Sequence, residues 1–127
     1  MATTTLHAAR LFIASALLLG GCAHSSFYRS SNNDLVPEAV AAEDVKVFKQ
    51  KDDVADEYVE LGLFRGSAPT VDEAMDKAKQ TCGDAGASMY ILNTPPFKSG
   101  KSYRVDGVCA AAPDAPPRKA GSTGKDI

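Results

Sequence analysis

The stretch TVDEAMDKAKQTCGDAGASMYILN, residues Thr70–Asn93, contains a helix start, a helix stop and a strand in direct succession. Thr70 and Glu73 have the spacing of a capping box, in which the threonine hydroxyl accepts a hydrogen bond from the Glu73 amide. Gly86 is the predicted helix stop, because glycine readily adopts the left-handed conformation that follows a last helical turn. Between them, apolar residues recur at helical spacing and predict one narrow buried stripe: Val71, Ala74, Met75, Ala78, Cys82 and Ala85.

Four strands are predicted around this helix. The apolar run Ala87–Asn93 predicts a strand buried on both faces. Val45–Phe48 and Tyr58–Arg65 predict two strands before the helix, and Ser102–Ala110 predicts the last. Alternation predicts that one face of the second strand carries Val59, Leu61 and Leu63. It predicts that one face of the last strand carries Tyr103, Val105, Gly107 and Cys109. The order ββαββ predicts a small α+β domain at residues 43–110, with one helix packed on a short sheet.

The N-terminus indicates export. Arg10 precedes the apolar run Leu11–Leu19, which ends in Leu19-Gly20-Gly21-Cys22. This ending resembles the lipobox of bacterial lipoprotein precursors, which implies a signal peptide at residues 1–21 and lipid on Cys22. The alternatives are an ordinary secretory leader and a membrane-spanning helix, but a spanning helix needs about 20 apolar residues. Ala23 and His24 follow the cysteine without the aspartate typical of inner-membrane retention, so the resemblance implies the outer membrane.

Two segments lack the pattern of a folded unit. Residues 22–42 are rich in Ser, Asn and Ala without apolar periodicity, which predicts a flexible tether behind the lipidated cysteine. Such a tether spans about 25 Å. Residues 111–127 contain three prolines, two glycines and scattered charge, which predicts a disordered tail.

Two cysteines remain once Cys22 carries lipid. Cys82 lies on the predicted buried stripe of the helix, and Cys109 lies on the strand face that we expect the helix to cover. Because an exported protein meets an oxidising compartment, a structural Cys82–Cys109 disulfide is predicted. The alternatives are two reduced core cysteines and a redox-active pair, although the spacing differs from the Cys-x-x-Cys motif of redox proteins.

A family resemblance rests on several short motifs. They are the strand Tyr58–Phe64 with Gly62 inside it, Asp72-Glu73-Ala74, Lys77-Ala78, and Gly86-Ala87 leading into the apolar strand. This pattern resembles the family of the outer-membrane lipoprotein sensor of the Rcs envelope-stress pathway and its uncharacterised relatives. That sensor has two disulfides where this chain can form one. The resemblance implies a lipid-anchored interaction module with an envelope protein partner, and it assigns no site residue.

The residues offer little to catalysis. After cleavage before Cys22 the chain retains one histidine, His24, in the predicted tether, so no Ser-His-Asp or Cys-His arrangement is expected within the domain. No pair of cysteines or histidines has zinc-site spacing, and no metal or other cofactor is predicted. We therefore predict a protein that is not an enzyme.

Two charged groups are candidate sites. Asp52, Asp53, Asp56 and Glu57 could bind calcium or support a small enzyme or an ion carrier, but they lack the spacing of a calcium loop and alternate with lysines. A solvated loop is the favoured interpretation. Lys98, Lys101 and Arg104 form either a basic contact patch or ordinary surface. With 14 basic and 16 acidic residues in the chain, no nucleic-acid partner is predicted.

Overall fold

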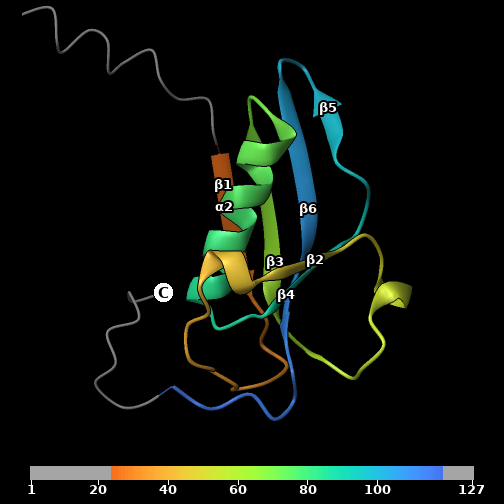
Figure 1. Ribbon diagram of the computed structural model, residues 1–127. Coiled ribbons are helices and arrows are strands. Elements are labelled where there is room, and N and C mark those ends of the chain that lie inside the picture. The colour runs from red at the N-terminus through yellow and green to blue at the C-terminus, as the bar shows by residue number, and fades with distance from the viewer. Residues whose placement is uncertain (1–23, 119–127) are drawn as a thin grey trace, which may run out of the picture.

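A computed structural model describes residues 24–118 as one α-helix packed on a six-stranded mixed sheet. The predicted α+β class is confirmed, and Figure 1 shows the helix α2 lying along one face of the sheet. The sheet order is β1-β3-β6-β4-β2, with β5 paired to β6, and only β2 and β4 run parallel among these strands. The elements are β1 (His24–Arg29), β2 (Lys46–Phe48), β3 (Val59–Ala68), α2 (Val71–Asp84), β4 (Met89–Leu92), β5 (Phe97–Ser99) and β6 (Ser102–Ala111).

Both predicted ends of the helix α2 are confirmed. The Thr70 hydroxyl accepts a hydrogen bond of 3.2 Å from the Glu73 amide and so satisfies one of the first N–H groups of the helix. Gly86 has φ of 92°, the left-handed conformation that glycine adopts without a steric penalty. Ala74, Ala78 and Cys82 face the sheet and are buried, as the stripe predicted.

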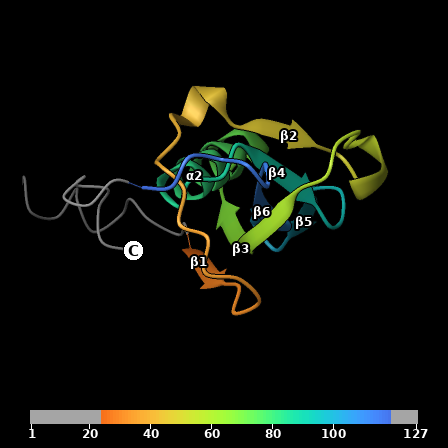
Figure 2. The same cartoon turned by 90° about the horizontal axis from the view of Figure 1, so that it is seen from below.

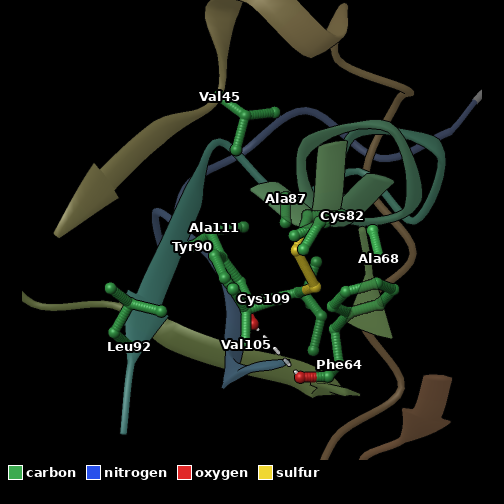
Figure 3. Close-up of a cluster of buried hydrophobic side chains, with 13 residues drawn as sticks. Val45, Phe64, Ala68, Cys82, Ala87, Tyr90, Leu92, Val105, Cys109 and Ala111 are labelled. Carbon is green, nitrogen blue, oxygen red and sulfur yellow. Dashed lines mark hydrogen bonds between the residues drawn. A yellow bond between two sulfur atoms is a disulfide. The ribbon is translucent and has the colours of Figure 1, made fainter. Parts of the chain in front are cut away.

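The helix-side core lies between α2 and the sheet (Figure 3). Cys82 of α2 and Cys109 of β6 form a disulfide with a Cα–Cα distance of 5.1 Å, which confirms the predicted pair. Phe64 and Tyr90 lie beside it, with ring centroids 5.9 Å apart in an edge-to-face arrangement. The Tyr90 hydroxyl donates a hydrogen bond of 3.2 Å to the Phe64 carbonyl. Burial, and to a lesser degree the charge of Asp106, raises the pKa of Tyr90 well above its ordinary value.

The predicted alternation in β3 is wrong after its second residue. A β-bulge shifts the register between Glu60 and Gly62, so that Leu61 has no counterpart on β6. The extra residue turns Leu61 and Phe64 toward the same helix-side core and turns Leu63 to the opposite face. The alternation of apolar and polar residues cannot show where such an insertion lies, because the residues before and after the bulge each alternate as in a regular strand.

A second, smaller cluster lies on the sheet face away from α2. Its buried members are Ile91, Val108 and Ala110. The loop between β2 and β3 covers them, because its Val54 and Tyr58 pack against the cluster. The rest of this face, toward β1 and β5, has no helix over it among the described residues (Figure 1).

The predicted tether is wrong where the structure describes it. His24–Arg29 form β1, which pairs antiparallel with β3 at the edge of the sheet. The Phe27 ring lies over Gly62, where any side chain would collide with it. Further along, Pro37 is fully buried, and Leu35 and Val40 pack against the helix-side core. Backbone pairing and these few contacts hold a segment whose composition shows no apolar period.

The predicted disordered tail is also wrong over its first residues. Ala111 is the last residue of β6, and Pro117 forms a β-bridge with Pro37. The Arg118 guanidinium donates hydrogen bonds of 3.2 Å to the Pro37 carbonyl and 2.8 Å to the Asp84 carbonyl at the end of α2. Figure 2, viewed from this end, shows the segment after β6 running past α2. The predicted signal peptide, Cys22 and residues 119–127 lie outside the described residues.

Candidate functional site

The candidate site is the uncovered part of the sheet face opposite α2, which we call the open face. Residues paired across antiparallel strands point to the same face, so the register groups side chains into rows. The first row is His24, Ser67, Arg104 and Phe97, on β1, β3, β6 and β5. The second row is Ser26, Arg65 and Asp106. Tyr28 lies beyond them on β1, opposite Leu63.

These rows border a shallow groove of about 390 Å³. Two aromatic side chains on it are unusually exposed, Tyr28 at 59% and Phe97 at 44%. The remaining lining is largely polar and includes His24, Ser26, Ser67, Arg65, Arg104 and Asp106. Exposed aromatic rings beside guanidinium groups are the residue types enriched where proteins bind other proteins.

The charges of the second row are already paired. Arg65 Nε lies 3.4 Å from Asp106 Oδ2, and the Asn93 side-chain amide donates a hydrogen bond of 3.1 Å to Asp106 Oδ1. Arg104, in the first row, takes part in none of the ion pairs found within residues 24–118. The open face is therefore most positive at the row that contains His24, Arg104 and Phe97.

His24 belongs to the folded domain, contrary to the prediction that the domain contains no histidine. It is the first residue of β1 and lies opposite Ser67. None of the side-chain hydrogen bonds found within residues 24–118 involves the His24 side chain, and the one to the Asp106 carboxylate comes from Asn93. A catalytic triad needs its base hydrogen-bonded to nucleophile and acid, and the described residues do not show that arrangement here.

The acidic loop lies away from the open-face rows. Asp52 and Asp53 fall in the short 3-10 helix Lys51–Asp53, and Asp56 and Glu57 follow it, all four exposed. Lys51 of the same loop lies 3.8 Å from the Glu60 carboxylate. Within the part of the chain that the structure describes, no group of three or more metal-binding side chains is found. Val54 and Tyr58 of this loop pack against the second cluster, on the sheet face away from α2.

The predicted basic trio lies in the β5–β6 hairpin. Phe97–Ser99 pair with Ser102–Arg104, and Gly100, with φ of 64°, provides the turn. Arg104 points to the open face, whereas Lys98 is paired with Tyr103 and points to the other face. Lys101 is at the tip. The three cations therefore surround the hairpin and do not form a patch on one face.

Sequence reasoning missed Tyr28, Arg65 and Phe97 as site residues. They come from three strands, and two of these, β1 and β5, were not predicted. The one available signal was the position of Phe97 directly after two prolines in a polar segment, where a large apolar side chain has no local core to join. The cross-strand register that groups the three residues is not visible in sequence.

Comparisons with known proteins give a structural match but no family. No protein-family model and no curated protein matches the sequence. Among solved structures, the fold is similar to the crystal structure of a Francisella virulence factor, FvfA, with a TM-score of 0.48 and 13% sequence identity. The alignment covers 70% of this chain and 97% of that chain. No helix in residues 24–118 is long and apolar enough to span a membrane. The Cys82–Cys109 disulfide indicates an oxidising, extracytoplasmic environment.

Proposed function

We propose that this protein is a lipid-anchored, non-enzymatic binding module of the bacterial envelope, held by Cys22 on the periplasmic face of the outer membrane. The Leu19–Cys22 motif supports the anchor, and the disulfide fits an exported domain. The resemblance to the Rcs sensor family supports the same general role. In this proposal the domain recognises an envelope protein.

The open face carries the proposal. Tyr28 is exposed beside Arg65 on a sheet face that no described helix covers. In interfaces, a tyrosine ring buries a large area, and guanidinium groups pair with carboxylates of the partner. The partner surface is therefore expected to combine apolar side chains with carboxylates.

Site-specific photo-crosslinking in intact cells tests this interface. A photoreactive amino acid replaces Tyr28 in the full-length precursor, and the matched control replaces Gln80, a residue of α2 on the other side of the sheet. A discrete protein adduct is expected from position 28, weakened by Arg65→Glu, and not from position 80. Equal labelling at both positions, or an adduct indifferent to Arg65→Glu, contradicts the proposed interface.

The anchor has its own test. Mass spectrometry of the mature protein is expected to show acyl chains on Cys22, and Cys22→Ser is expected to leave the precursor uncleaved or release the protein from membranes. An exported protein with an unmodified Cys22 would contradict the anchor whatever the crosslinking shows.

A further inference from the structure

We infer that the β5–β6 hairpin rests against the phospholipid surface that holds the anchor, through contacts of Phe97, Lys98, Lys101 and Arg104 with anionic headgroups. This inference rests on the proposed lipidation of Cys22. It deepens the proposed function by fixing which end of the domain faces the lipid.

The sheet register places the hairpin and His24, the first described residue after the proposed anchor, at one end of the molecule. His24 is in the same row as Arg104, and Cys22 is two residues before His24, so at most about 7 Å of chain separates them. The hairpin strand β6 begins at Ser102, two residues before Arg104, so the tip projects about 7 Å beyond the same row. Cys22 therefore lies within about 7 Å of the row beyond which the hairpin tip projects by a similar length.

The composition of the hairpin suits an anionic surface. Residues 97–104 contain three basic side chains and no acidic one. The cations surround the hairpin, an arrangement that fits insertion of a tip into a headgroup layer better than docking of one flat face. Phe97, 44% exposed, adds an apolar side chain of the kind that enters the interface between headgroups and acyl chains.

The acidic residues at this end lie on the first turn of α2. Asp72 and Glu73 lie there, where the helix dipole partly offsets their charge. In Figure 1 the β5–β6 hairpin extends beyond the first turn of α2, so the basic element reaches the surface before the acidic one. The second-row carboxylate, Asp106, is paired with Arg65. Charge and position thus both favour the hairpin as the contact.

Tryptophan fluorescence tests the contact, because the chain contains no tryptophan. Phe97→Trp is made in the lipidated mature protein, and Tyr28→Trp is the matched control on the same open face, farther from the anchored end. Both are reconstituted in phosphatidylcholine vesicles with and without phosphatidylglycerol. In the anionic vesicles the Phe97→Trp protein is expected to emit at shorter wavelength and to be quenched by brominated lipids, while the Tyr28→Trp protein keeps a solvent-exposed spectrum.

Charge neutralisation sharpens the test. Lys98→Gln, Lys101→Gln and Arg104→Gln are combined in the Phe97→Trp protein. Each basic side chain near an anionic surface favours contact about five-fold, so the ratio of contacting to free hairpin is expected to fall about 100-fold. A higher salt concentration is also expected to lower the ratio of contacting to free hairpin in the Phe97→Trp protein.

The outcomes separate the two proposals. Acyl chains on Cys22, measured in the same samples, report on the anchor alone, and an unmodified Cys22 overturns the proposed function. With Cys22 acylated, a tryptophan at position 97 that is as exposed as the one at position 28 overturns the hairpin contact. Quenching of the Phe97→Trp protein that is unchanged by salt and by the three glutamines overturns the role of anionic headgroups.

Discussion

The two faces of the sheet differ in what their side chains do. On the helix side, Phe64, Tyr90 and the Cys82–Cys109 disulfide are fully buried against α2. On the other side, burial is limited to the cluster around Ile91 and Val108, and the groove beside it exposes Tyr28 and Phe97. The comparison indicates that stability depends mainly on one face, and the other face is the one on which we propose recognition. Four predictions test that division.

Aromatic truncation should separate the faces most clearly. Phe64→Ala removes a ring from the helix-side core and is expected to lower the free energy of unfolding by about 3 to 5 kcal/mol. Phe97→Ala, on the open face, is expected to change it by less than about 0.5 kcal/mol. Urea unfolding of both variants measures the contrast. A similar loss of unfolding free energy in both variants would mean that Phe97 packs in a core as Phe64 does.

Removing the disulfide should have the next largest effect. The bridge closes a loop with a sequence separation of 27 residues, and the chain-entropy model assigns about 3 to 4 kcal/mol to such a loop. Cys82→Ala with Cys109→Ala is therefore expected to lower Tm by about 15 to 25 °C. Reducing agent should destabilise the parent protein and leave the double variant unchanged. A parent protein with the same Tm before and after complete reduction would refute the estimate.

Alkaline pH should weaken the helix side through Tyr90. Its pKa is raised in the folded protein, so above about pH 10 the unfolded chain loses the phenolic proton while the native protein keeps it. Stability should then fall as pH rises, by up to about 1.4 kcal/mol per pH unit. Tyr90→Phe loses the hydrogen bond to the Phe64 carbonyl, at a cost of about 1 kcal/mol near neutral pH, but escapes this fall.

Urea unfolding of both proteins across the alkaline range measures this effect. Their stabilities should converge, and Tyr90→Phe should become the more stable protein at the highest pH. A difference between the two proteins that stays constant across pH would show that Tyr90 ionises equally in both states.

The smallest effect is expected at the acidic loop. Changing Asp52, Asp53 and Asp56 to Asn and Glu57 to Gln alters only exposed charges and is expected to shift stability by less than about 0.5 kcal/mol. Val54→Ala in the same loop removes a contact with the second cluster and is expected to cost about 1 kcal/mol. The anchored protein should keep its cellular phenotype when the four carboxylates are neutralised. Loss of that phenotype with stability intact would identify the loop as a site.

The helix-side face was largely predictable from sequence. Thr70, Glu73 and Gly86 act within a few residues of one another, so their spacing alone predicts where α2 begins and ends. Cys82 and Cys109 followed from two correctly predicted faces. Local periodicity works here because each pattern repeats within its own element.

The open face depends on interactions that local patterns do not contain. β1 is held at the sheet edge by backbone hydrogen bonds, and Phe27 is its one side chain in the helix-side core, so its composition resembles a linker. The bulge at Leu61 moves the later residues of β3 to the opposite face, and no change in the kinds of residue along the strand marks its position. Arg118 holds the C-terminal segment by bonding to carbonyls of Pro37 and Asp84, which are distant in sequence.

The edge strand β1 also has a mechanical consequence. It is the first described element of the chain and pairs antiparallel with β3 over six residues, from His24 to Arg29. A pull on the residues just before His24 acts along the strand axis, so it loads the hydrogen bonds of this ladder together, in shear. Peeling the strand from its other end would break them one after another at lower force. With the proposed lipid on Cys22 and a proposed partner bound to the domain, this direction of attachment would resist traction between the two.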